Sequence, residues 1–329
     1  MTTHETPKTT TKRALIRPEA MQTILAFAGL IVIFFAFYLT TPYFRGFENL
    51  VAILLSTAVN GVLALGVTFV IITGGIDLSI GTILTFSAVT TGVFIVDMGL
   101  PMPLGVALGL LAGALCGLIN GFVIAKMKVP PFIATLGMMM MTKGLSLILS
   151  HSKPVYFTDL PAFRQIAMGN LIPGVNIPNA VVVLFGAAII ASLILGKTIL
   201  GRYNFAIGSN EEATRLSGVN VDQWKMAIYT LCGLFAGLGG ILMASRLDSA
   251  QPALGAGYEL DAIAAVVIGG TSLSGGEGTI LGTIIGAFIM STLTNGLRIR
   301  SVPQEWQMVV TGLIVIGAVY LDIMRRRTK

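Results

Sequence analysis

The chain has 329 residues, of which 54% are hydrophobic and only 11% are charged, and its mean hydropathy is +0.86. Soluble domains carry roughly 25% charged residues, so this composition excludes a water-soluble fold, which could not bury so much apolar surface. The net charge of +6 comes without a basic stripe interleaved with aromatic residues, so it argues against nucleic-acid binding and indicates cationic loops on one side of a membrane.

The N-terminal region combines a polar tail, residues 1–20, with an apolar run at 21–41. A signal peptide has an apolar region of only about 7–15 residues, followed by a cleavage site of small residues. This run is longer, and the sequence YLTTPYF at its end offers no such site. We therefore expect 21–41 to be a retained first membrane span.

Further apolar runs follow, each close to the ~20 residues that cross the hydrocarbon of a bilayer. They lie near 50–73, 79–97, 103–125, 131–150, 179–196, 224–244, 259–270, 279–297 and 306–323, and the run at 259–270 is short. The sequence therefore predicts an all-α, polytopic transmembrane bundle of about ten spans. This domain occupies residues 21–324 and precedes a basic tail, 325–329.

The distribution of lysine and arginine predicts the orientation of the bundle. If the N-terminus is inside and the spans alternate, most cations fall in the tail 1–20, at 126–128, in the loop 197–223 with the residues just after it, and at 325–329. Cationic loops stay in the cytoplasm, so both termini are expected there, in a multi-pass protein of the bacterial inner (plasma) membrane.

No motif for a bound metal or nucleotide is present. Cys116 and Cys232 lie in apolar runs, and His4 and His151 are isolated, so we expect no metal site. The sequence LGKT at 195–198 lacks the glycine spacing of a phosphate-binding loop. If ATP drives the protein, another subunit must bind it.

The cytoplasmic loop 197–223 contains the signals of a short helix. These are a cap, two acids in the first turn, a basic residue that can pair with them, and a terminal glycine: Ser209 or Asn210, Glu211, Glu212, Arg215 and Gly218. The pattern predicts a helix of about two turns at the membrane surface. Its exposed side chains are suited to docking on a soluble partner, and the alternative is an ordinary connecting helix.

Two glycine-rich segments resemble each other, GGIDLSIGTIL at 74–84 and GGTSLSGGEGTIL at 269–281. Both place glycines and a polar Leu-Ser turn between apolar runs. Such breaks at membrane depth are tolerated when they are buried in protein or line a water-filled path. The alternative is two tight cytoplasmic turns of similar chemistry, because the predicted topology places both on one side.

Several polar residues within or beside the spans are candidates for the translocation pathway: Asn60, Asp77, Ser79, Asn120, Glu259, Asp261, Ser272 and Ser274. Polar groups in membranes are costly and frequently functional. Each has a structural alternative. Asp77, Glu259 and Asp261 can cap helices, and the asparagines can hydrogen-bond to a neighbouring helix.

Several long segments carry a resemblance to a known family. GGIDLSIG, GRYNFAIGSNEEATRLSGVNV, SAQPALGAGYELDAIAAVVIGGTSLSGGEGTILGT and a later NGL resemble the ribose, xylose, arabinose and galactose class of ABC importer permeases. The similarity runs from about residue 41 to the C-terminus and is strongest over 201–282. It implies a type II-like permease with broken helices that moves a monosaccharide, such as ribose or a related pentose, by alternating access.

The resemblance also implies partners and roles. The partners are a cytoplasmic ATPase with two nucleotide-binding modules, which holds ATP and Mg, a periplasmic sugar-binding protein, a second permease copy and membrane lipid. The coupling helix that docks on the ATPase falls on Asn210, Glu211, Glu212, Ala213, Thr214, Arg215, Leu216, Ser217 and Gly218. The chain itself is then a transport subunit without catalytic residues.

The same features fit other classes of transporter. An ABC permease for a hexose, a polyol or a branched-chain amino acid fits the same features. An ion-coupled secondary transporter is disfavoured because the spans hold few acids and no histidine for a proton relay. A receptor or scaffold would ordinarily carry a folded soluble domain, and no loop here is long enough for one.

Overall fold

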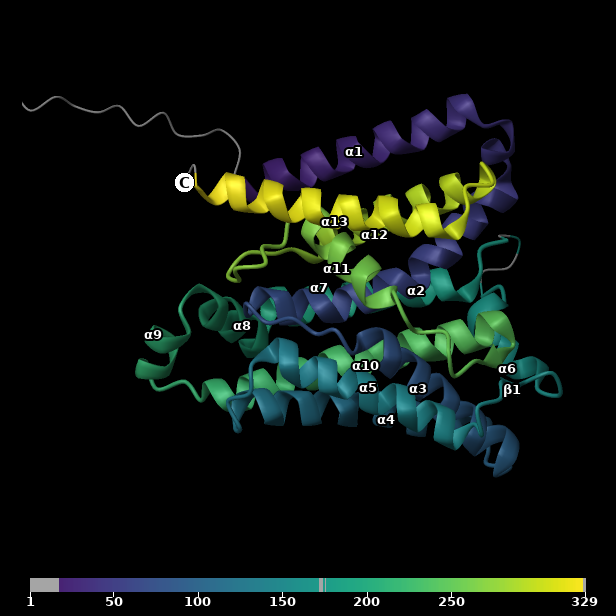
Figure 1. The fold of residues 1–329 in the computed structure, drawn as a ribbon, viewed down its shortest axis with the longest axis horizontal. Helices are drawn as coiled ribbons and strands as arrows, with labels where there is room; N and C mark the ends of the chain where they lie inside the picture. Colours follow the sequence, from purple (N-terminus) through teal and green to yellow (C-terminus); the bar gives the residue numbers. More distant parts are fainter. Residues whose placement is uncertain (1–17, 172–173, 175, 328–329) are drawn as a thin grey trace, which may run out of the picture.

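The computed structural model describes residues 18–171, 174 and 176–327, which form an almost entirely helical bundle (Figure 1). The helices are α1 (Pro18–Thr40), η1 (Pro42–Arg45), α2 (Phe47–Ile72), α3 (Ile80–Gly92), η2 (Val93–Asp97), α4 (Met102–Ala125), α5 (Pro131–Leu149), α6 (Pro161–Met168), α7 (Asn179–Lys197), α8 (Ile199–Ser209), α9 (Glu211–Leu216), α10 (Val221–Leu247), α11 (Tyr258–Ile268), α12 (Ile280–Ile299) and α13 (Gln304–Arg327). The strands β1 (Val155–Tyr156) and β2 (Ser249–Ala250) pair antiparallel, with Val155 opposite Ala250. The predicted fold class is confirmed, and most of the predicted tail 1–20 lies outside the described residues.

All but one of the predicted spans correspond to long helical segments of the structure. Within the described residues, eight helical segments are long and apolar enough to cross a bilayer: Gln22–Thr40, Phe47–Ile72, Ile80–Asp97, Met102–Ala125, Pro131–Leu149, Asn179–Lys197, Val221–Leu247 and Ile280–Ile299. The predicted run at 306–323 lies inside the continuous helix α13, whose 24 residues reach about 36 Å. The run at 259–270 forms only the 11-residue α11, which reaches about 16 Å and so covers half of a bilayer.

The helices form two halves with inverted directions. In the first half α3 packs on α4 and α5, and in the second α11 packs on α12 and α13. The long helices α2 and α10 pack against each other in the centre, and each also contacts the other half, α10 through α4 and α2 through α12. The equivalent helices are therefore α2 with α10, α3 with α11, α4 with α12 and α5 with α13.

The two ends of the bundle are named here for the elements that they carry. The α9 end holds α9 and the turn 269–279, where the Gly276 amide donates to the carbonyl oxygen of Ile72, the last residue of α2 (2.9 Å). The opposite end, the strand end, holds the β1–β2 pair. Figure 1 shows that α9 projects beyond the other helices at this end. The N-terminal end of α1 and the C-terminal end of α13 lie toward the same end.

Close helix contacts depend on glycine. A Cβ on Gly117 of α4 would overlap the carbonyl oxygen of Tyr229 in α10, and a Cβ on Gly233 of α10 would overlap the carbonyl oxygen of Gly113. Small residues let helix backbones approach in lipid, where packing rather than hydrophobic burial holds helices together. The glycines at this crossing therefore permit the tight α4–α10 contact.

Each half contains a segment that re-enters the bundle in non-helical conformation. Residues 73–79 turn back from the α9 end before α3 begins, as the extended trace after α2 in Figure 1 shows. Residues 248–257 link α10 to α11 in the equivalent position of the second half. A Cβ on Gly81 would overlap the carbonyl oxygen of Gly255, so the starts of α3 and α11 meet inside the bundle. Longer helices cover both places, because α3 packs against α4, α5 and α10 and α11 packs against α2, α12 and α13, as non-helical backbone at membrane depth requires.

Candidate functional site

Three of the predicted pathway residues form one buried network at the first re-entrant segment. Asp77 is 0% exposed, and its Oδ1 accepts from the Ser79 amide (2.9 Å) and the Ser79 hydroxyl (2.6 Å). Asn120 of α4 donates its Nδ2 to the Ser79 oxygen at 2.9 Å. The Tyr229 hydroxyl of α10 donates to the carbonyl oxygen of Ile76 at 3.4 Å. The network thus fastens residues 73–79 between α4 and α10.

The capping alternative for Asp77 is only partly realised. Ser79, rather than Asp77, occupies the position before the first residue of α3. Asp77 instead closes a local turn by accepting two bonds from Ser79. Its second oxygen, Oδ2, has no hydrogen-bond partner among the described residues.

At the second re-entrant segment, the acids Glu259 and Asp261 have different surroundings. Both carboxylate oxygens of Glu259 accept from the Gly257 amide at 3.1 Å, and this carboxylate lies against Gly81 of α3. Asp261 instead lines a cavity of about 550 Å³ between α11, α12 and α13, which also receives Arg298. We refer to this space as the α11–α13 cavity.

The remaining predicted pathway residues lie apart from these groups. Asn60 lies buried in α2, and its Oδ1 has no partner among the described residues. Ser272 is buried and Ser274 is exposed in the turn at the α9 end. The eight predicted residues therefore do not form one site. Sequence reasoning also missed Arg298, which belongs to the α11–α13 cavity.

The predicted short helix is present as α9, with the expected local signals. The Asn210 Oδ1 accepts from the Ala213 amide at 2.9 Å, so Asn210 is the cap, whereas Ser209 ends α8. Gly218 follows the helix with φ of 83°, the left-handed conformation that glycine adopts without strain. Thr214 faces the protein and is buried, which fixes the orientation of the helix.

A charge network connects α9 to two other parts of the α9 end. Arg215 pairs with Glu211 (3.3 Å), as predicted, and also with Asp222 of α10 (3.0 Å), whereas no pair with Glu212 occurs among the described residues. Lys128, in the loop between α4 and α5, reaches Asp222 at 3.0 Å. Lys225 of α10 reaches Glu211 at 2.6 Å. Partial burial would raise the pKa of Glu211, but the bonds from Lys225 and Arg215 lower it below its usual value.

The outer face of α9 is open to a partner. Leu216 is 83% exposed, and Glu212, Ala213 and Ser217 are exposed beside it. An exposed leucine at the tip of a polar helix leaves apolar surface in water, which a hydrophobic pocket of a partner would bury.

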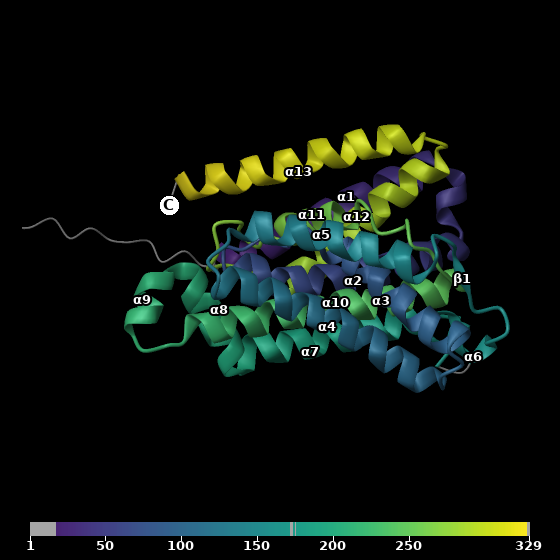
Figure 2. The same ribbon diagram turned by 60° about the horizontal axis from the view of Figure 1, so that its bottom comes forward.

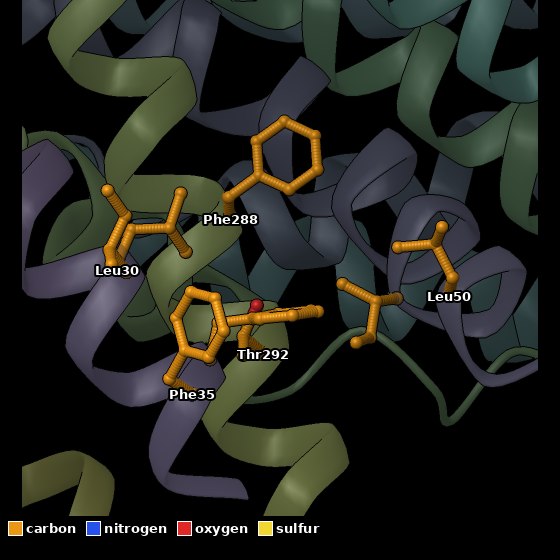
Figure 3. Close-up of a pocket in the computed structure, with 8 residues that line it drawn as sticks. Leu30, Phe35, Leu50, Phe288 and Thr292 are labelled. Atoms are coloured by element: carbon orange, nitrogen blue, oxygen red, sulfur yellow. The ribbon is translucent and has the colours of Figure 1, made fainter. Parts of the chain in front are cut away.

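A second groove on the protein is almost entirely apolar, unlike the α11–α13 cavity. A groove of about 220 Å³ lies between α1, α2 and α12 and is lined by Leu30, Ile31, Phe34, Phe35, Leu50, Ile53, Phe288 and Thr292. Figure 3 shows that its side chains are hydrocarbon except for the Thr292 hydroxyl. Such a surface suits lipid chains and offers no set of groups that binds a polar solute.

Comparison with known proteins gives consistent matches over nearly the whole chain. A family model described as "Branched-chain amino acid transport system / permease component" matches residues 49–319. The ribose import permease protein RbsC of Bacillus subtilis (strain 168) is 45% identical over 305 residues, covering 92% of this chain and 93% of that protein. RbsC of Escherichia coli (strain K12) is 41% identical over 285 residues, covering 86% and 88% of the two chains.

A sugar permease of another specificity is also similar. The L-arabinose transport system permease protein AraH of Escherichia coli (strain K12) is 39% identical over 298 residues, covering 91% of this chain and 89% of AraH. No solved structure matches the chain significantly.

Proposed function

The chain belongs to this family of ABC transport permeases, and we propose that it is the membrane-spanning subunit of an importer that carries ribose or a related pentose. The observation that carries the proposal is the similarity to two ribose import permeases over at least 86% of the chain. The ribose import permeases match at 38–45% identity and the arabinose permease at 39%, so D-ribose is the first substrate to test and L-arabinose, a related pentose, is the second. Import of a hexose, a polyol or a branched-chain amino acid becomes an outcome of that test.

The importer then needs partners that supply energy and substrate. We propose two copies of this chain, a cytoplasmic ATPase with two nucleotide-binding modules that binds ATP and Mg, and a periplasmic sugar-binding protein. The segment from Asn210 to Gly218 docks on the ATPase, which the exposure of Leu216 supports. The α9 end faces the cytoplasm with both termini, and the cations Lys126, Lys128 and Lys225 at that end fit this orientation.

The two inverted halves suggest how solute crosses. Because α3 and α11 start inside the bundle, displacement of one half against the other opens the path to one side at a time. A ligand shifts such an equilibrium only through its different affinity for the two states, so the permease holds sugar weakly. The eight polar residues predicted from the sequence remain candidates for this path.

Uptake by the complete importer in vesicles tests the function. We expect ATP-dependent uptake of D-ribose that excess L-leucine leaves unchanged. Uptake that leucine inhibits and ribose does not would assign the chain to amino acids. Uptake that needs no ATPase and collapses with a protonophore would assign it to secondary transport.

The docking helix has a test that leaves the fold intact. Leu216→Asp removes an exposed apolar side chain, and we expect about 1.5–3 kcal/mol of lost ATPase binding, the free energy of burying a leucine side chain. Co-purification of the ATPase with the permease measures it. Arg215→Glu is expected to abolish both co-purification and uptake.

The matched control is Leu171→Asp, an exposed leucine near the strand end, at 68% exposure. This variant should retain the ATPase. Equal retention by the Leu216→Asp variant would contradict the docking role of α9.

A further inference from the structure

The α11–α13 cavity has the size and shape of a small-molecule site. Its volume of about 550 Å³ lies within the range of roughly 300–1,000 Å³ typical of ligand pockets. Three elements form it, namely the first turns of α11, the last turns of α12 and the first half of α13. Figures 1 and 2 show α13 along the outside of the bundle, next to α12 and α11.

The lining combines hydrogen-bonding groups with apolar surface. Asp261 supplies a carboxylate acceptor, Arg298 a set of N–H donors, and Gln304 and Gln307 groups of both kinds. Apolar side chains of α13, such as Met308, complete the wall. A monosaccharide has the complementary surface, because its hydroxyls form a polar rim around faces of C–H groups.

The polar groups of the cavity are largely unused within the protein. Among the described residues, neither the Asp261 carboxylate nor the Arg298 guanidinium makes an ion pair or a side-chain hydrogen bond. Gln307 donates its Nε2 to the Val302 carbonyl oxygen at 2.8 Å, which leaves its side-chain oxygen as an acceptor. Donors and acceptors are therefore available to a ligand without breaking a bond in the protein.

The position of the cavity fits a solute that enters from the strand end. Arg298 lies in the last turn of α12 and Gln304 begins α13, at the connection between these helices. Asp261 lies in the first turn of α11, directly after the second re-entrant segment. The cavity thus extends from the end opposite α9 toward the point where α3 and α11 meet.

We propose that the α11–α13 cavity is a sugar-binding subsite of the permease, in which Asp261 and Arg298 bind hydroxyl groups of an uncharged monosaccharide. This inference rests on the proposed function, from which it takes the class of its ligand. The opposite charges of the two side chains suit a neutral polyol better than an anion or a cation. The subsite receives the sugar on the side of the bundle where the binding protein delivers it.

Thiol labelling in the complete importer tests the subsite directly. Thr311→Cys places a thiol in the cavity, and the native Cys116 and Cys232 are buried, so they contribute little background. We expect a charged, membrane-impermeant thiol reagent to label this cysteine, and D-ribose with its binding protein to slow labelling roughly tenfold, the effect of about 1.4 kcal/mol of binding. Leu313→Cys, on the exposed apolar face of α13, should react slowly with or without ribose.

Adding Asp261→Asn to the Thr311→Cys variant should abolish the protection by ribose. D-ribose uptake by vesicles that hold the wild-type importer and by vesicles that hold the Thr311→Cys variant separates the two proposals. If the Thr311→Cys vesicles import ribose without any protection of the thiol, the subsite alone is overturned. If the wild-type vesicles import neither ribose nor a related pentose, the proposed function is overturned and the subsite with it.

A pair of neighbouring arginines provides a second, independent test. Arg298→Gln should lower ribose uptake roughly tenfold to a hundredfold, the usual loss for one hydrogen bond to a charged group. Arg300→Gln is the control, because Arg300 bonds to the Thr41 hydroxyl (3.1 Å) instead of lining the cavity, and should transport almost normally. Equal uptake by the two variants, at equal amounts of folded protein, overturns the role of Arg298.

Discussion

The two re-entrant segments solve the same backbone problem with different side-chain chemistry. At residues 73–79, Asp77, Ser79 and Asn120 bond to one another and are shielded from water. At residues 248–257 and the start of α11, Glu259 closes its own turn, whereas Asp261 faces the α11–α13 cavity without a side-chain bond to any described residue. In the first half the polar side chains thus hold the backbone in place, whereas in the second half a polar side chain is available to a solute.

The largest expected effect lies in the closed network. Asp77→Leu would leave the Ser79 amide and hydroxyl without their acceptor. Each buried unsatisfied group costs about 1–3 kcal/mol, so we expect a loss of 3 kcal/mol or more. Thermal unfolding of the purified protein in detergent measures the effect.

Asp77→Asn is the matched control, because its amide oxygen can still accept from Ser79. It should unfold close to the wild-type temperature. If the Asp77→Leu variant were equally stable, the first segment would not depend on this network.

A smaller effect is expected where the two halves touch. Gly255→Ala places a methyl group against the carbonyl oxygen of Gly81, and overpacking of this kind costs about 1–3 kcal/mol. Unfolding temperature and ribose uptake should both fall. Gly137→Ala on α5 has no atom within 4 Å of the added carbon and should behave as wild type. A Gly255→Ala variant without any defect would mean that the two segments do not press on each other.

The smallest effect is expected at Glu259, which makes only a local turn. Glu259→Ala removes the acceptor of the Gly257 amide and should cost about 1 kcal/mol, as the loss of a helix cap does. Glu259→Gln keeps an acceptor oxygen and should cost less. A loss of uptake in both variants with unchanged unfolding temperature would instead place Glu259 on the solute path, and the contrast with Asp261 would then disappear.

Much of this architecture was predictable because hydropathy and capping are local properties. The apolar runs predicted the positions of the long helices. A few adjacent residues were enough to predict that α9 begins after the capping residue Asn210 and ends before Gly218. The run at 259–270 was counted among the ten spans as a short one, and it forms the half-span α11, because hydropathy does not report where non-helical backbone begins. Gly257, with φ of 98°, marks that boundary, yet glycine is frequent throughout the chain.

The candidate site was less predictable because its residues meet only in the folded protein. Arg298 and Arg300 lie two residues apart in the same short segment, so the local sequence does not distinguish them. Only the packing of α12 and α13 places Arg298 in the cavity and Arg300 against Thr41. Asp222 gains its partner Lys128 across a separation of 94 residues, which no local pattern reports.

The ion pairs of α9 also have a mechanical consequence. Glu211 and Arg215 attach this helix to Lys225 and Asp222 of the second half, and Asp222 in turn attaches to Lys128, at the edge of the first half. A displacement of α9 is therefore transmitted to both halves at once through these ion pairs, rather than through a single flexible loop. Because exposed ion pairs weaken as salt screens them, the stiffness of this junction should decrease with rising ionic strength.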